Sequence, residues 1–187
     1  FAIGLFKKIV LADNVGAYAT PVFAAAEQGA ALTLLESWAG LLAYTCQIYF
    51  DFSGYSDMAI GLARLFGIRL PLNFNSPYKA RCIVDFWRRW HISLSSWLRD
   101  YLYISLRGNR GGSFKTYRNL ILTMLLGGLW HGASWAFVVW GALHGLYLVL
   151  ERLAAHLFGA WPGWKTLAGQ IFLALVTFSL VCFAWIF

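Results

Sequence analysis

A histidine set between glycines is the strongest candidate for chemistry in this chain. His131 stands in Gly-Gly-Leu-Trp-His-Gly at residues 127–132, in the middle of a run over residues 119–150 without Asp, Glu, Lys or Arg. Such a run can cross a bilayer, which needs about 20 apolar residues, and ionisable groups at membrane depth are usually functional. Glycines also let a substrate or a backbone approach closely. The pattern favours a functional His131, and the alternative is a buried polar residue that bridges two helices.

A second histidine, His91, lies in a helix predicted over residues 85–103. At 100° per residue it shares a face with Arg88, Ser95 and Arg99, opposite a face of aromatic and leucine side chains. A helix of this kind lies at a membrane interface or lines a polar cavity. For His91, a functional site and an ordinary headgroup-facing surface are therefore both open.

The remaining histidines are weaker candidates. His144 follows His131 by 13 residues, about 20 Å along a continuous helix, so the two can share a site only if the helix breaks between them. His156 stands near a loop, where an exposed histidine needs no function. No two histidines are spaced i, i+4 and no H-E-x-x-H pattern occurs, so the local signals of a zinc site are missing.

Two carboxylates interrupt an otherwise apolar helix predicted over residues 37–66. Asp51 and Asp57 are candidate proton carriers, but pairing with Arg64 or with a cation of another helix is the commoner use of such groups. The same helix carries a small polar stripe that is expected to turn away from lipid. Its members are Ser53, Asp57, Gly61 and Arg64.

Composition identifies a membrane protein. The chain is 60% hydrophobic and 12% charged, against about 25% charged residues in an average soluble domain. It begins with Phe1 and ends with Phe187, and no signal peptide is visible. We interpret residues 1–187 as a single membrane domain truncated at both ends. The three cysteines lie far apart without a C-x-x-C pattern, which argues against a disulfide framework and a zinc ribbon.

Positive charge is concentrated in residues 64–118. This segment holds 11 of the 15 Lys and Arg residues beside only Asp85 and Asp100, a net charge of +9. Short basic segments of membrane proteins stay in the cytoplasm, which predicts that residues 64–118 face the cytoplasm. The apolar runs around this segment argue against nucleic-acid binding, the other common use of a basic patch.

Hydropathy and helix breakers predict the remaining elements. Residues 1–26 mix apolar side chains with two lysines and contain Pro21, which suits an interfacial helix followed by a turn better than a full span. The glycines of the 119–150 run leave open one long helix or two helices meeting at His131. Residues 166–187 are uncharged and predict a transmembrane helix.

Four long motifs run through most of the chain. They are Tyr-Phe-Asp-Phe-Ser-Gly-Tyr-Ser-Asp at 49–57, Asp-Phe-Trp-Arg-Arg-Trp-His-Ile-Ser-Leu-Ser at 85–95, Trp-Leu-Arg-Asp-Tyr-Leu-Tyr at 97–103 and Gly-Gly-Leu-Trp-His-Gly at 127–132. In content and order they resemble the membrane-bound O-acyltransferase family, above all the bacterial branch that O-acetylates alginate and related exopolysaccharides. The resemblance implies an all-α fold, a polytopic transmembrane helical bundle with interfacial or re-entrant amphipathic helices.

The resemblance also implies roles for the two histidines. The invariant histidine of the family corresponds to His131, and its second, upstream position, an Asn or a His, corresponds to His91. An acyl group passes from a thioester to a hydroxyl group, and a neutral imidazole can take the hydroxyl proton, so His131 is the predicted general base. His91 is predicted to polarise the thioester carbonyl or to hold the acceptor. The predicted substrate-binding residues are Arg88, Trp130 and Ser95.

Substrates and partners follow from the same resemblance. The donor is acetyl coenzyme A or another acyl thioester, with no bound cofactor and no metal. The implied partners are membrane lipid, a secreted or periplasmic acetyltransferase, coenzyme A or a carrier protein, and a polysaccharide acceptor, at the bacterial inner membrane. One rival is D-alanyl transfer to teichoic acid, or peptidoglycan O-acetylation, by the same fold. Another is a non-catalytic scaffold or transporter, in which His131 relays protons or packs.

Overall fold

Helices build the structure, a computed structural model that describes residues 1–160 and 162–187. No strand occurs in these residues, and the predicted all-α class is confirmed. Contacts divide the chain into two compact units, residues 1–73 and 74–185, with Ile186 grouped with the first unit and Phe187 with the second. The single membrane domain predicted for residues 1–187 stays a prediction.

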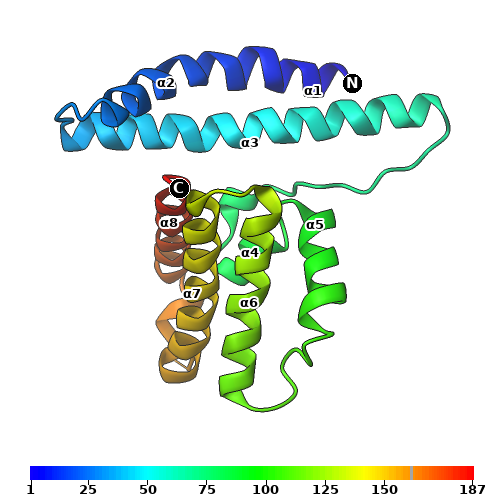
Figure 1. Cartoon of the computed structure of the whole chain (residues 1–187), viewed down its shortest axis with the longest axis vertical. Helices are drawn as coiled ribbons and strands as arrows, with labels where there is room; N and C mark the ends of the chain where they lie inside the picture. Colours follow the sequence, from blue (N-terminus) through cyan, green and yellow to red (C-terminus); the bar gives the residue numbers. More distant parts are fainter. Residues whose placement is uncertain (161) are drawn as a thin grey trace. The chain divides into compact units, whose positions relative to one another are not determined.

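In the first unit an N-terminal helix lies along a longer helix (Figure 1). Three consecutive segments pack on a fourth, and they are α1 (Ala2–Phe6), the π-helical η1 (Lys7–Ala12), α2 (Asp13–Glu27) and α3 (Leu34–Leu65). The two helices approach closely, because a methyl group on Gly4 would overlap the carbonyl oxygen of Gly54. Thr33 begins α3 with a capping box, in which its side chain accepts from Glu36 N–H and the Glu36 carboxylate accepts from Thr33 N–H.

The turn predicted after an interfacial helix in residues 1–26 is wrong, whereas the interfacial position of the helix stays a prediction. The helix continues through Pro21 to Glu27. By length and composition, Ala2–Glu27 is one of three helices among the described residues that can cross a membrane. The physical reason is that membrane helices tolerate an internal proline, while the lysines that indicated an interface are paired.

Ion pairs join both lysines of the first unit to aspartates. Lys7 Nζ lies 2.6 Å from Asp57 Oδ2, and Lys8 Nζ lies 2.8 Å from Asp13 Oδ1 and 2.6 Å from Asp51 Oδ1. Asp51 and Asp57 therefore pair with cations of another helix, which was the commoner of the two uses expected for them. Pairing lowers the cost of holding these groups in apolar surroundings.

The polar stripe of α3 faces the N-terminal helix over three of its four members. Ser53 is 1% exposed, Asp57 pairs with Lys7, and a methyl group on Gly61 would overlap the backbone of the first residue. Arg64 is exposed. The stripe therefore faces the N-terminal helix as far as Gly61, which lies against the first residue of the chain; its orientation away from lipid stays a prediction.

In the second unit three long helices lie side by side (Figure 1). They are α6 (Ser113–His131), α7 (Trp135–Phe158) and α8 (Leu167–Ala184). By length and composition α7 and α8 can cross a membrane, and α8 confirms the helix predicted over residues 166–187. The shorter elements are the 3-10 turn η2 (Pro77–Lys79), α4 (Ile83–Trp87), α5 (Ile92–Trp97), the π-helical η3 (Leu98–Tyr103) and the 3-10 turn η4 (Pro162–Lys165).

α6 and α7 form an antiparallel hairpin that packs through glycines. A methyl group on Gly128 would overlap the carbonyl oxygen of Phe137, and one on Gly141 would meet the carbonyl oxygen of Met124. Because both obstacles are backbone atoms, these positions need glycine for the two helices to come this close.

The uncharged run of residues 119–150 breaks next to His131. α6 ends at His131, and α7 begins at Trp135 with Ser134 as its N-cap. The Ser134 hydroxyl accepts a hydrogen bond of 3.3 Å from Ala136 N–H. Of the two arrangements that the sequence left open, two helices meeting at His131 is confirmed.

The single helix predicted over residues 85–103 is wrong. α4 ends at Trp87 and α5 begins only at Ile92. The turn between them resets the helical period, so Trp97 is 52% exposed although the 100° spacing puts it on one face with the buried Phe86. The cause is the backbone of residue 91, which adopts φ 42° and ψ 56°, a left-handed conformation that ends a right-handed helix.

Candidate functional site

Both candidate histidines stand where a helix begins or ends. His131 is the last residue of α6, and His91 directly precedes α5. Histidine is among the few side chains enriched in the left-handed conformation that His91 adopts, and such conformations concentrate at functional sites. The Ser95 hydroxyl donates a hydrogen bond of 2.9 Å to the carbonyl oxygen of Trp90 and so stabilises the turn. Ser95 therefore supports the position of His91, whatever else it contacts.

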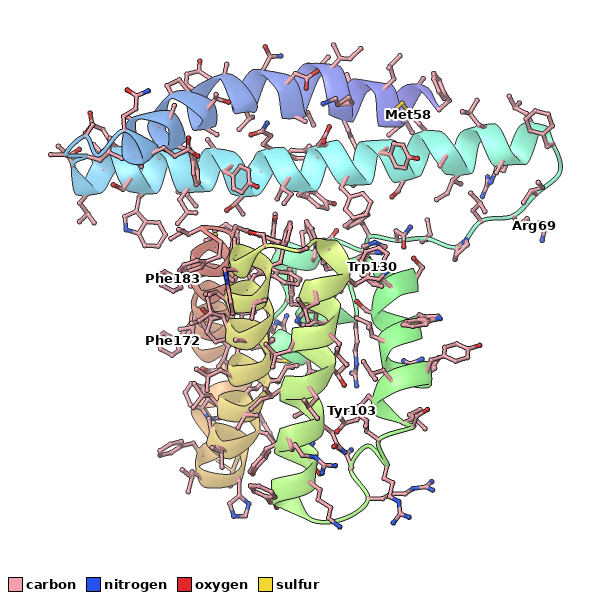
Figure 2. All side chains as sticks on the ribbon, in the orientation of Figure 1. Met58, Arg69, Tyr103, Trp130, Phe172 and Phe183 are labelled. Atoms are coloured by element: carbon pink, nitrogen blue, oxygen red, sulfur yellow. The ribbon has the colours of Figure 1, made fainter. Side chains whose placement is uncertain are left out.

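Trp130, labelled in Figure 2, lies at the end of α6, and its ring contacts those of both histidines. Its indole ring lies 6.3 Å from the His91 ring, measured between centroids, at an interplanar angle of 76°. It lies 5.1 Å from the His131 ring at 81°. The break in the 119–150 run and the turn before α5 thus bring together three residues that the sequence singled out.

The surroundings of His91 favour its neutral form. His91 is half-buried, whereas His131 is exposed. Burial lowers the pKa of His91, and the positive charge of a protonated His131 lowers it further. The His91 Nδ1 atom lies 3.5 Å from the Ser93 hydroxyl. At neutral pH His91 is therefore an imidazole with one N–H donor and one acceptor nitrogen.

The sequence predicts that His144 can share a site with His131 only if the helix breaks between them. The helix does break between His131 and His144, and both rings contact Trp140 of α7. The centroid of Trp140 lies 5.3 Å from that of His131 and 4.8 Å from that of His144. The signal that could have found this is the i, i+4 spacing of Trp140 and His144, which puts both on one face of α7.

A cavity of about 370 Å³ lies beside α4, α5 and α6. Arg88 and Ser95, two of the predicted substrate-binding residues, line it, but Trp130 does not. Other polar lining residues are Ser96, Arg99 and Thr123. The neighbouring Arg89 is held by Asp85, with Nε 2.9 Å from Oδ1, and Arg99 is held by Asp100, with Nε 2.7 Å from Oδ1. Arg88 is therefore the arginine of this cavity that is available to a ligand.

Trp87 connects the cavity to the rings of Trp140 and His144. Its side chain lines the cavity and lies 5.6 Å from Trp140 and 5.0 Å from His144 between ring centroids. α4, which carries Trp87, is anchored to α7 because Ile83 N–H donates to the Glu151 carboxylate.

A second, larger pocket of about 760 Å³ lies in the basic turn before α6. Three arginines line it, Arg99, Arg107 and Arg110, and Tyr103, labelled in Figure 2, lines both this pocket and the smaller cavity. The turn is anchored by the buried Asn119 side chain, whose amide donates to the carbonyl oxygens of Leu106 and Gly108 over 2.7 and 3.0 Å. Guanidinium groups on a turn whose backbone is anchored can bind phosphate or carboxylate.

No group of three or more His, Cys, Asp or Glu side chains that could hold a metal ion occurs in the described part of the chain. Cys82 instead caps α4, its sulfur accepting from Asp85 N–H over 3.4 Å. Burial raises the pKa of the Cys82 thiol, which disfavours the thiolate that a metal needs.

The family model of the membrane-bound O-acyltransferase (MBOAT) family matches residues 1–186. The chain belongs to this family. With its three candidate spans it is part of a multi-pass membrane protein. The match includes both units and every residue of the site.

Relatives of this MBOAT chain carry several acyl-transfer names. It is 60% identical over 152 residues to a probable alginate O-acetylase of Azotobacter vinelandii, covering 81% of this chain and 30% of the relative. It is 50% identical over 187 residues to a peptidoglycan O-acetyltransferase of Helicobacter pylori, covering 100% of this chain and 34% of the relative. It is 34% identical over 158 residues to a teichoic acid D-alanyltransferase of Streptococcus thermophilus, covering 80% of this chain and 38% of the relative. The chain thus spans about a third of the length of the curated relatives it matches.

Proposed function

We propose that the full-length protein containing this MBOAT chain is a membrane O-acyltransferase. It moves an acetyl group from a cytoplasmic thioester toward the hydroxyl groups of an alginate-like polysaccharide outside the bacterial inner membrane, directly or through a secreted partner acetyltransferase. The observation that carries the proposal is the contact of His91 and His131 with one indole ring, Trp130. The 60% identity to a probable alginate O-acetylase supports the acetyl group and the polymer class.

The proposed reaction needs one proton carrier and no covalent enzyme intermediate. The proton of the acceptor hydroxyl passes to a ring nitrogen of His131, and the oxygen bonds to the acyl carbon. The carbon–sulfur bond then breaks, and the thiolate recovers the proton from His131. A positioned base of this kind contributes roughly 10²- to 10⁴-fold to a rate. The exposed position of His131 leaves it open to both substrates.

His91 has a complementary role in this scheme. Because its pKa is lowered, the ring stays neutral beside His131 and donates one N–H hydrogen bond. Such a donor stabilises the negative charge that develops on the thioester oxygen, or it holds the acceptor hydroxyl. Trp130, which contacts both histidines, covers one side of the reacting groups.

The two basic cavities are the proposed donor site. Arg88 lines one and Arg107 and Arg110 line the other, while Arg99, which lines both, already pairs with Asp100. Their charges attract the phosphates of coenzyme A or an acidic carrier protein. Enforcing the cytoplasmic position of residues 64–118 is the other use of these cations. Neither a bound cofactor nor a metal enters the scheme.

Two other acyl transfers fit the same site. The relative of Helicobacter pylori, named for peptidoglycan O-acetylation, aligns with all of this chain, and the relative of Streptococcus thermophilus is named for D-alanyl transfer to teichoic acid. The acceptor decides between them, because the histidine chemistry is the same. Measuring ester-linked acetate and D-alanine on each purified polymer, in cells with and without the full-length gene, separates the three.

His131→Ala in the full-length protein tests the proposed mechanism. We expect polymer O-acetylation to fall by about 10²- to 10⁴-fold, with the protein still present in the membrane at a near-normal level. The matched control is His156→Ala, because His156 is an exposed histidine at the far end of α7. Retention of more than half of the activity by His131→Ala would refute the general-base role and favour a scaffold or transporter.

Sealed vesicles of known orientation test the direction of transfer. Labelled acetyl thioester supplied on the side of residues 64–118 should acetylate acceptor on the opposite side. If transfer required donor and acceptor on one side, the cross-membrane part of the proposal would be wrong, even with His131 essential.

A further inference from the structure

A fully buried histidine on α7 has no part in the mechanism above. His144 is 0% exposed, and rings surround it. The centroid distances from His144 are 4.8 Å to Trp140, 5.0 Å to Trp87, 5.7 Å to Tyr147, 6.1 Å to Phe86 and 6.4 Å to Trp185. Phenylalanine would fill such a site without any polar atom, so the presence of an imidazole needs a reason.

The polar atoms of this cluster lack hydrogen-bond partners within the described residues. They are Nδ1 and Nε2 of His144, the hydroxyl of Tyr147 and the Nε1 atoms of Trp87, Trp140 and Trp185. Leaving one such group buried and unpaired costs about 1–3 kcal/mol. The free-energy cost of burying six such unpaired groups in one cluster is too large for them to be a by-product of packing. Native structures satisfy groups of this kind with ordered water.

The chemistry of the cluster matches a small guest that both donates and accepts. The three indole groups can only donate, whereas the hydroxyl of Tyr147 does both. His144 is neutral, because an unpaired imidazolium cannot be buried at tolerable cost, so it offers one donor and one acceptor. Water satisfies this combination, since it accepts two hydrogen bonds and donates two.

The cluster touches both parts of the proposed site. Trp140 contacts His144 and also contacts His131, at 5.3 Å and an interplanar angle of 83°. Trp87 contacts His144 and also lines the 370 Å³ cavity. A change at His144 therefore reaches the proposed base through one ring and the proposed donor cavity through another.

We propose that His144 is a positioning residue for acyl transfer. With the indole N–H groups of Trp87 and Trp140 it forms a buried polar site that holds water, and this site fixes the two indole rings and, through Trp140, the ring of His131. The role rests on the proposed acyltransferase function. His144 itself touches neither substrate.

The test replaces His144 in the full-length protein. His144→Phe keeps a ring and removes both nitrogens, whereas His144→Gln keeps a donor and an acceptor. We expect His144→Phe to lower kcat for transfer from labelled acetyl thioester at least tenfold, with little change in KM, and to lower the melting temperature because buried indole N–H groups are left unpaired. His144→Gln should recover most of kcat. His156→Phe, an exposed histidine of the same helix, should behave as wild type.

A purely structural role predicts the opposite, because a phenylalanine in this apolar setting would leave kcat unchanged and raise stability. That result would overturn the proposal. If His144→Phe fails to accumulate, Tyr147→Phe removes a single unpaired hydroxyl from the same cluster, and an unchanged kcat in Tyr147→Phe would likewise overturn the proposal.

A spectroscopic readout separates this proposal from the proposed function. Ultraviolet resonance Raman bands of the indole N–H groups report their hydrogen bonding, whatever acceptor the enzyme uses. The wild-type spectrum should contain bands of hydrogen-bonded indole that are missing from the spectrum of His144→Phe. Identical spectra would refute the hydrated site. If His131→Ala kept its acyl-transfer activity while this Raman difference was still observed, the acyltransferase mechanism would be refuted and the hydrated site would not.

Discussion

Alanine should be tolerated at one and not at the other of two adjacent glycines in the 127–132 motif. A methyl group on Gly127 meets only the flexible end of the Leu98 side chain, at 3.1 Å from Cδ1, whereas one on Gly128 overlaps the carbonyl oxygen of Phe137 and lies 3.3 Å from the Cα atom of Gly141. A side chain end can rotate away at little cost. A backbone carbonyl in the facing helix moves only if α6 and α7 separate.

The magnitudes follow from two terms. Replacing a glycine inside a helix by alanine gains roughly 0.5–1 kcal/mol of stability, and both glycines gain it. Overpacking against a fixed neighbour costs about 1–3 kcal/mol, and only Gly128 bears that cost. Gly127→Ala should therefore lie within about 1 kcal/mol of wild type, and Gly128→Ala should be less stable than Gly127→Ala by about 1–3 kcal/mol.

The assay is thermal unfolding of both full-length variants in detergent, together with polymer O-acetylation in cells. Gly128→Ala should melt at a lower temperature and lose most activity, because separating the helices also moves Trp140 away from His131. Equal melting temperatures and equal activities for the two variants would refute the close packing of α6 on α7 at this position.

Three further predictions follow. Because burial and the charge of a protonated His131 lower the pKa of His91, its ring stays neutral as the pH falls through about 6.5, so the NMR signals of the His91 ring in the full-length protein should titrate below that value; a midpoint above it would contradict a neutral His91. With Cys82 replaced, a cysteine in place of Ser113 should react with impermeant thiol reagents only after permeabilisation, and labelling in intact cells would reverse the predicted topology. Asp57→Asn should destabilise the full-length protein by leaving the Lys7 charge unpaired, and adding Lys7→Met should restore melting; an additive loss in the double variant would mean that the pair contributes nothing.

Much of the fold could be predicted from local signals. The uncharged segment over residues 166–187 predicts α8, and the glycines beside His131 predict the break between α6 and α7, because both depend on composition within one segment. The pairing of Asp57 with a cation of another helix is general for membrane carboxylates. Its partner, Lys7, is 50 residues away in sequence, so only the folded chain identifies it.

The error over residues 85–103 has a definite cause. A helical wheel assumes one continuous period, and Phe86 and Leu94 fit it because α4 and α5 are each helical. His91 breaks the period with a single left-handed residue, and no glycine or proline marks that turn in the sequence. The aromatic pattern over residues 85–103 therefore belongs to two separate helices, α4 and α5, which one continuous helical period does not describe.

His144 lies near His131 because the helix breaks between them. The hairpin turn between His131 and Trp135 reverses the chain, so a residue that lies about 20 Å away on a straight helix instead shares a neighbouring ring, Trp140, with His131. Once the break is recognised, the i, i+4 pair Trp140 and His144 points to a polar ring behind the proposed base. The short turn at residues 132–134 is thus as much a part of the site as the histidines, because its length determines which ring of α7 meets His131.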